Sequence, residues 1–214
     1  MTSFPLIIIS PGLLMAAALL FVARPGRRPG RLPVVPEAAT LAAFSLGLGG
    51  LGQLWFAGPM AMILGDVTIF RLDTVTATMT LLVAFVGWVV VRYARRYLDG
   101  EAREGWFHAL TLTTIAVVLV LVQAASLPVL VASFLATGLV LRQLLLFYPE
   151  RAEAQRAAAK FIRVWGAGDV ALILAAVLLW QSSGTVDIAA LTTTGGLPVL
   201  AQASVGLLVL SAAL

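Results

Sequence analysis

Seven long apolar runs, separated by short polar segments, dominate this sequence. Each run is long enough for an α-helix to cross a hydrocarbon core about 30 Å thick. With 61% hydrophobic and only 11% charged residues, the chain carries more apolar surface than a soluble domain could bury. We therefore expect an all-α, polytopic membrane helix bundle of about seven transmembrane helices. The expected spans are Pro5–Ala23, Ala38–Phe56, Thr74–Arg92, Phe107–Gln123, Leu127–Phe147, Phe161–Trp180 and Leu197–Leu214.

The basic residues are distributed unevenly between the connections. Twelve of the fourteen follow the first, third or fifth run, whereas the connections after the second, fourth and sixth runs carry only Arg71. Because basic residues are retained on the cytoplasmic side during insertion, this pattern predicts an N-terminus outside the cell. It also accounts for the net charge of +4 without nucleic-acid binding. The twelve are Arg24, Arg27, Arg28, Arg31, Arg92, Arg95, Arg96, Arg103, Arg151, Arg156, Lys160 and Arg163.

The connections give weaker predictions. Val67–Leu72 alternates in polarity and predicts a short strand or hairpin. Pro149–Lys160 is rich in alanine and charge and indicates a cytoplasmic helical turn leading into the sixth span, whereas Gln181–Gly196 is typical of a polar outer loop. Leu214 closes an apolar run without a polar flank, so we expect the chain to be the N-terminal part of a longer protein.

The second span contains Gly47, Gly49 and Gly52, which match the dinucleotide pattern G-x-G-x-x-G. That pattern requires a preceding strand and free N–H groups at a helix N-terminus. Inside an apolar span the amides are already paired, so we interpret these glycines as helix-packing residues. Ser45 and Gly49 also form a small-xxx-small pair, which permits close helix approach.

Asp169 is the strongest candidate for a functional residue, because it lies eight residues inside the sixth span. A carboxylate at that depth must face protein or water, and it marks an ion or proton path in many membrane proteins. The alternative is a structural carboxylate that hydrogen-bonds to a broken helix. Both interpretations remain open at this point.

Two basic residues are the other candidates for an ion path. Arg142 lies inside the fifth span, and an antiparallel arrangement of spans five and six would bring it to a depth similar to that of Asp169. An ion pair between them is one hypothesis, and extension of Arg142 to the cytoplasmic interface is the other. Lys160 precedes Asp169 by nine residues, so the two point to opposite helix faces and direct pairing is not expected.

The sequence gives little support for a metal site, a titrating histidine or a bound cofactor. Cysteine is absent, which excludes disulfides and thiolate metal sites. His108 is the single histidine and is expected at the inner membrane interface rather than in a titrating role. No motif for a flavin, quinone, haem or other cofactor is recognisable.

The segment Phe70–Met79 resembles the F-x-L-D-G-L-S-L-x-M pattern of antiporter-type subunits of proton-pumping NADH dehydrogenase. The similarity covers roughly residues 65–180. It implies the same multi-helix fold, in which a glutamate of span five and a lysine of span seven drive charge transfer. Further matching positions are Tyr93–Leu98, Trp106, Phe107, Gly138, Leu139, Phe147, Tyr148, Lys160 and Gly168–Val170.

The departures from this pattern are informative. Pumping relatives carry Gly-Trp-Glu shortly before the Gly-Leu step, whereas this chain has Ser133-Phe134-Leu135. Leu135 cannot titrate, so the usual pump element is missing. The family's lysine of span seven would fall just past Leu214. Arg142 followed by Leu144–Arg151 instead resembles the DabB membrane subunits of inorganic-carbon accumulation complexes.

That resemblance implies a multi-pass protein of the bacterial inner membrane. Its partner would be DabA, a large soluble zinc protein similar to β-carbonic anhydrases. A cation gradient, with protons as the expected ion, would drive CO2 hydration or bicarbonate accumulation. The other candidate functions are a proton-translocating subunit of an NADH-quinone oxidoreductase or multisubunit antiporter, and a helix bundle that only anchors a partner. Lys160 and Asp169 are the family positions that carry over.

The expected organisation has three parts. Residues 1–64 form the first two helices, residues 65–125 the antiporter-like N-terminal region, and residues 126–214 the start of a proton-translocating core.

Overall fold

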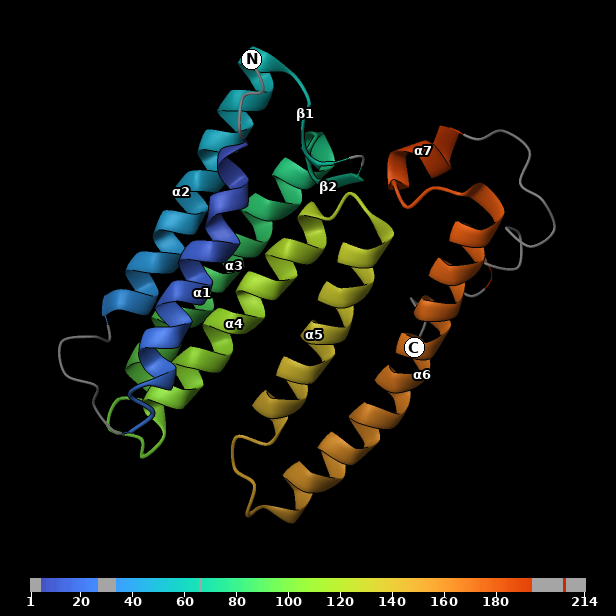
Figure 1. Ribbon diagram of the computed structural model, residues 1–214. Coiled ribbons are helices and arrows are strands. Elements are labelled where there is room, and N and C mark those ends of the chain that lie inside the picture. Colours follow the sequence, from blue (N-terminus) through green and yellow to red (C-terminus); the bar gives the residue numbers. More distant parts are fainter. Residues whose placement is uncertain (1–4, 27–33, 66, 194–205, 207–214) are drawn as a thin grey trace. The chain divides into compact units, whose positions relative to one another are not determined.

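The computed structural model describes residues 5–26, 34–65, 67–193 and 206. Within these residues, five helices are long and apolar enough to span a membrane, which confirms the predicted membrane bundle (Figure 1). The first predicted span is the 3-10 turn η1 and helix α1, and the seventh, Leu197–Leu214, lies outside the described residues except for Gly206. The elements are η1 (Leu6–Ile8), α1 (Ile9–Val22), α2 (Val34–Ala57), β1 (Met60–Leu64), β2 (Val67–Leu72), α3 (Thr74–Tyr97), α4 (Glu104–Gln123), α5 (Leu127–Leu145), α6 (Ala152–Ser183) and α7 (Ile188–Thr193).

Two compact units make up the chain. The first comprises Met1–Met62 and Phe70–Gln123, and the second comprises Ile63–Ile69 and Ala124–Leu214. Helices α1 to α4 belong to the first unit, whereas α5, α6 and α7 belong to the second.

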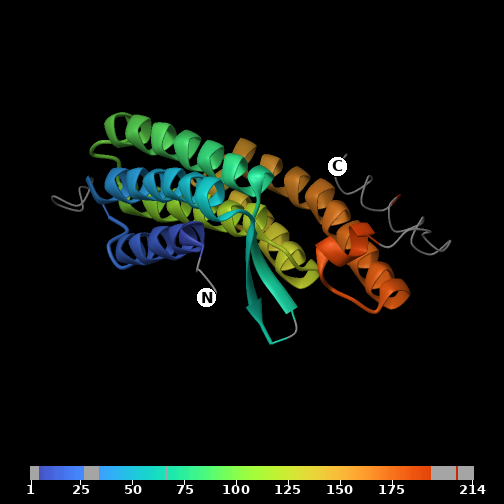
Figure 2. The same cartoon turned by 90° about the horizontal axis from the view of Figure 1, so that it is seen from above.

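The first unit is a bundle in which α1 packs on α4 and α2, and α3 packs on α2 and α4. Figures 1 and 2 show these four helices running side by side. Large apolar side chains of α1 and α4 fill its centre between alanines of α2 and α3. This packing brings the helix backbones close together, as is usual where lipid rather than water surrounds the bundle. The buried core includes Leu14, Phe21, Ala43, Ala84, Leu112 and Leu119.

The glycines of α2 serve helix packing, as predicted. A methyl group added at Gly50 would overlap the side chain of Ile7, and one at Gly47 would lie 3.4 Å from Leu81 Cδ1. Ser45, in contrast, is exposed and its hydroxyl donates to the Leu41 carbonyl of the same helix. The closest approach therefore occurs at Gly47 and Gly50 rather than at the predicted pair of Ser45 and Gly49.

A β-hairpin follows α2, which confirms the strand predicted at residues 67–72. Strands β1 and β2 pair with each other (Figure 2), and Gly65 adopts a φ of 63° between them. A positive φ is accessible to glycine at little cost, so this residue permits the tight turn. Asp73 then begins α3, because its carboxylate accepts a hydrogen bond from the Thr76 amide at 2.8 Å.

The second unit contains the paired helices α5 and α6. The 32 residues of α6 extend about 48 Å, well beyond the hydrocarbon thickness. The helical turn predicted at residues 149–160 forms the first part of α6 from Ala152 onward, and most of its side chains are exposed. Gln181–Ser183 completes α6, and the predicted outer loop contains α7.

Backbone hydrogen bonds hold the start of α5 against the segment between α6 and α7. The Leu127 amide donates to the Val186 carbonyl at 2.9 Å, and the Ile188 amide donates to the Ala125 carbonyl at 3.0 Å. These bonds satisfy backbone groups outside the helices, as an apolar environment requires.

Candidate ion path between α5 and α6

Trp165 of α6 sets the register between the two helices. Its ring stacks between Phe134 of α5, at a centroid distance of 5.0 Å, and Phe161 of its own helix, at 5.1 Å. Its indole also lies directly on Gly138, where any side chain would overlap it. Trp165 therefore packs between the two helices.

Asp169 lies one helical turn beyond Trp165. It is about 26 Å from the start of α6 and about 21 Å from its end, at 1.5 Å per residue. The carboxylate Oδ1 is buried without a hydrogen-bond partner among the described residues, and so is Trp165 Nε1. Because four residues separate Trp165 from Asp169, the indole and the carboxyl group leave the same side of α6.

The unpartnered oxygen bears on the two interpretations of Asp169. A carboxylate that capped a broken helix would accept bonds from free backbone amides, and α6 is continuous from Ala152 to Ser183. A buried polar atom without a partner in such a helix is costly. Asp169 is therefore available to accept a proton or a hydrogen bond from a mobile group.

Arg142 is half-buried in the last turn of α5. Since Gly138 faces Trp165 and the helices are antiparallel, Arg142 lies near the level of Phe161, about two turns from Asp169. The expectation of similar depths is therefore wrong, because it assumed equal span ends rather than the register that Trp165 imposes. Among the described residues, no ion pair joins Arg142 to Asp169, which favours an interfacial position for the guanidinium group.

Lys160 is exposed on α6. Nine residues separate it from Asp169, so it leaves the helix on the opposite side. The structure thus brings none of the three predicted residues into direct contact. Arg142 and Lys160 lie on the cytoplasmic side in the predicted orientation, and Asp169 lies deeper in the helix pair.

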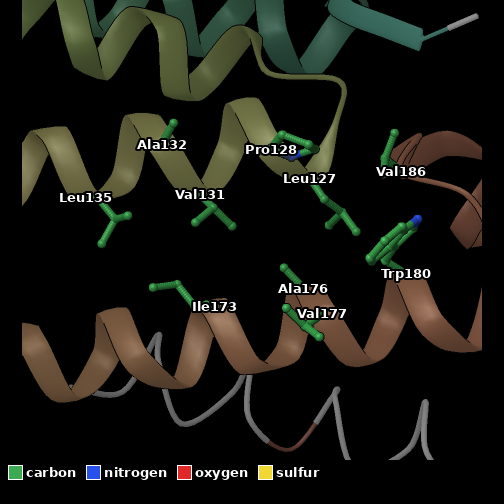
Figure 3. Close-up of a pocket in the computed structure, with 10 residues that line it drawn as sticks. All are labelled: Leu127, Pro128, Val131, Ala132, Leu135, Ile173, Ala176, Val177, Trp180 and Val186. Atoms are coloured by element: carbon green, nitrogen blue, oxygen red, sulfur yellow. The ribbon is translucent and has the colours of Figure 1, made fainter.

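An apolar cavity of about 310 Å³ opens between α5 and α6 on the other side of Asp169 (Figure 3). Leu135 and Ile173 line the end nearer to Asp169, and Trp180 and Val186 line the other end. Leu135, the position at which pumping relatives carry glutamate in the expected alignment, is thus part of a wall without charged side chains. The remaining lining residues are Leu127, Pro128, Val131, Ala132, Ala176 and Val177.

The first unit holds a buried acid–histidine pair that the sequence did not predict. His108 is fully buried near the start of α4, and Phe21 lies 5.7 Å from its ring. Its Nε2 lies 4.0 Å from Oε1 of Glu104, one turn earlier on α4. The i, i+4 spacing of the two residues was the available signal. The burial was not predictable, because it results from α1 packing over this turn.

A second unpredicted arrangement joins α2 and α3. Glu37 contacts Arg95 at 2.5 Å and Arg92 at 3.8 Å. Fifty-eight residues separate Glu37 from Arg95, so sequence spacing gives no indication of this contact.

Two family models match the chain. Residues 67–108 match the N-terminal region of NADH-ubiquinone oxidoreductase (complex I) chain 5. Residues 124–214 match the transmembrane region of the NADH:quinone oxidoreductase/Mrp antiporter family.

The curated relatives include two inorganic-carbon transporter subunits and one NADH-ubiquinone oxidoreductase chain 5. "Probable inorganic carbon transporter subunit DabB2" of Halothiobacillus neapolitanus is 27% identical over 85% of this chain and 35% of its own length. DabB1 of the same organism is 31% identical over 78% of this chain and 30% of its own length. NADH-ubiquinone oxidoreductase chain 5 of Metridium senile is 31% identical over 56% of this chain and 20% of its length. The chain spans about a third of the length of the DabB relatives.

Solved structures share the fold. A chain of the archaeal membrane-bound sulfane sulfur reductase, a respiratory membrane complex, has a TM-score of 0.79 at 16% identity, covering 97% of this chain and 42% of that one. A chain of respiratory complex I from Thermus thermophilus has a TM-score of 0.71 at 18% identity, covering 96% and 42%.

Proposed function

The chain belongs to the family of antiporter-like membrane subunits that includes NADH-ubiquinone oxidoreductase chain 5, and from this premise we propose that it forms part of an energy-coupling subunit for inorganic-carbon accumulation. In this proposal a cation gradient, with protons as the ion, drives a carbonic-anhydrase-like partner protein. The observation that carries the proposal is the similarity to two inorganic-carbon transporter subunits over most of the chain.

The cavity wall supports this assignment. In the family pattern described above, the titratable residue of α5 is a glutamate, whereas Leu135 here faces an apolar space. The carboxylate within the apolar part of this helix pair is instead Asp169 on α6, one turn from Ile173. A titratable group on α6 instead of α5 supports the assignment to a subunit that uses the ion gradient for a purpose other than redox-driven pumping.

The chemistry that we assign to Asp169 is reversible protonation. Uptake of a proton removes the negative charge and with it the cost of placing a carboxylate in apolar surroundings. Trp165 Nε1, one turn away, has no hydrogen-bond partner among the described residues and would stabilise the charged form by donating a hydrogen bond to it. Lys160 and Arg142 form the cytoplasmic entrance, where their charge controls which ions approach.

The partner would carry out the hydration of CO2. This chain has no cysteine and one histidine, and His108 is buried between aromatic rings. Zinc-bound water needs a site with several protein ligands and an open position. We therefore assign the zinc and the hydration step to the partner protein, a large soluble protein of the carbonic-anhydrase type.

The first test is purification of the tagged full-length protein from its native membrane, followed by identification of the proteins that accompany it. A stoichiometric zinc protein of the carbonic-anhydrase type supports the proposal. Recovery of quinone-reductase or antiporter subunits instead would overturn it.

The second test measures uptake of labelled inorganic carbon by cells that depend on the complex. Asp169→Asn should abolish uptake, Asp169→Glu should retain part of it, and Glu153→Gln, an exposed carboxylate change on the same helix, should have no effect. Full uptake by Asp169→Asn would remove Asp169 from the path.

The second candidate function is a proton-translocating subunit of an NADH-quinone oxidoreductase or a multisubunit cation/proton antiporter. The similarity to chain 5 of Metridium senile and the fold shared with respiratory complexes favour it. Sodium- or redox-dependent proton movement in vesicles, with unchanged inorganic-carbon uptake in a deletion strain, would support this function over the first.

A further inference from the structure

A polar hollow of about 430 Å³ lies where the start of α2 meets the end of α3 in the first unit. Three arginines and two carboxylates line it: Glu37, Arg92, Arg95, Arg96 and Asp99. Counted as formal charges, the lining is net positive. In the predicted orientation this end of the bundle faces the cytoplasm, where anionic headgroups attract basic residues.

Two of the arginines are held in place by other side chains. The Glu37 carboxylate contacts Arg95 at 2.5 Å and Arg92 at 3.8 Å, and the Arg92 guanidinium lies 5.4 Å from the centroid of the Trp88 ring. A guanidinium group that is already oriented loses less entropy when it binds an anion. Arg96, by contrast, is exposed and has no ion pair or hydrogen bond within the described part of the chain.

An exposed apolar stripe of α3 leads directly to these arginines. By helix periodicity, the face of the stripe continues into Tyr93 and Tyr97, and Arg96 and Arg92 lie along one edge of that face. From Val75 to Val90 it extends about 22 Å, more than the hydrocarbon half-thickness of about 15 Å. The exposed tyrosines Tyr93 and Tyr97 stack at 5.7 Å beside the arginines, as aromatic residues do at the interface. The stripe comprises Val75, Met79, Leu82, Phe85, Val86, Val89 and Val90.

We propose that this hollow binds the phosphate group of an anionic phospholipid whose acyl chains lie along the apolar stripe of α3. Arg92 and Arg96 would donate hydrogen bonds to the phosphate oxygens, because guanidinium groups match phosphate geometry in two-pronged contacts. Basic pockets beside transmembrane helices on the cytoplasmic side bind such headgroups. The adjoining stripe favours a lipid over a free anion, since a free anion gains nothing from apolar surface.

Topology alone does not account for this arrangement. Arginines that only orient the helices need no carboxylate from another helix to position them and no hollow between them. Glu37 provides that carboxylate, and it lies in the first turn of α2. The site does not depend on the proposed function, because it lies in the first unit and uses none of the residues of the α5–α6 path.

The test is native mass spectrometry of the full-length protein after delipidation, titrated with phosphatidylglycerol, with phosphatidylcholine and with inorganic phosphate. We expect retention of phosphatidylglycerol and little retention of phosphatidylcholine. Arg92→Gln with Arg96→Gln should weaken phosphatidylglycerol binding roughly tenfold or more. Arg96→Gln alone, which breaks no contact within the described residues, should weaken it by a smaller factor and keeps the test valid if the double variant does not fold.

The matched control is Arg156→Gln with Arg163→Gln, which removes the same charge from exposed positions of α6 and should change binding less than twofold. Equal losses in both pairs would show a general effect of net charge and overturn the site. Equal retention of phosphatidylcholine, or competition by inorganic phosphate as strong as that of the lipid, would also overturn it. If a partner protein that co-purifies with the chain covers the apolar stripe of α3, this face binds protein rather than lipid, and the proposal is wrong.

Discussion

The indole ring of Trp165 lies on the backbone of Gly138, and a methyl group added to that glycine would come within 2.6 Å of the ring carbon Cδ1. This contact fixes the register of α5 against α6. It places Arg142 near Phe161 and leaves Asp169 one turn beyond the ring stack. The separation of the predicted charged pair thus follows from one glycine–tryptophan contact.

Gly138→Ala should destabilise the second unit. The added methyl group forces either the indole or α5 to move, which costs about 1–3 kcal/mol in a packed interior. Thermal unfolding in detergent measures the loss. Gly166→Ala is the control, because the space beside Gly166 is open and alanine favours helix. Equal melting temperatures for the two variants would contradict the close contact.

Glu37→Gln should weaken the attachment of α2 to α3. The change leaves Arg95 without the carboxylate at 2.5 Å, and both side chains are partly screened by solvent, so we expect a loss of about 1 kcal/mol. A double-mutant cycle with Arg95→Gln isolates the pair from other effects. A coupling energy near zero would mean that the contact does not contribute to stability.

Arg142→Gln and Asp169→Asn should act independently. Residues this far apart usually add within about 0.5 kcal/mol, in contrast to the coupling expected for Glu37 and Arg95. The measurement is a double-mutant cycle from denaturant unfolding, with the Glu37–Arg95 cycle as the positive control. A coupling energy above 1 kcal/mol would restore the ion pair predicted from span ends.

Leu135→Glu should be poorly tolerated. The variant places a carboxylate in a wall formed by apolar side chains, which costs about 2–3 kcal/mol or more at bilayer depth. The amount of folded protein in the membrane and its melting temperature report the loss. Leu145→Glu, at the exposed end of α5, should be much milder. If Leu135→Glu were as stable as the parent protein, the cavity would have to contain water.

Hydropathy and charge made most of the fold predictable. Runs of apolar residues long enough to cross the bilayer must form helices, because no water satisfies their backbone groups. The alternation in Val67–Leu72 predicted the strand, and the glycines of α2 predicted close packing. The helical turn predicted ahead of the sixth span is continuous with it from Ala152, because charged side chains do not end a helix that extends beyond the membrane.

The candidate site was predictable only in part. Asp169 was identifiable because a carboxylate inside an apolar run is costly wherever it lies. Its relation to Arg142 was not, since counting residues from span ends cannot give the offset between two helices. The burial of His108 and the contact of Glu37 with Arg95 also escaped prediction, because each depends on a neighbouring helix that is distant in sequence.

The sequence by itself therefore determined which segments enter the membrane and which charged residues lie within them, because the transfer of each segment into lipid depends on its own composition. The tertiary structure alone decided which of those residues meet. The contacts Gly138–Trp165 and Glu37–Arg95 arise from steric fit and charge pairing between helices. Those forces act over a few ångströms in space and have no counterpart in the linear order of the residues.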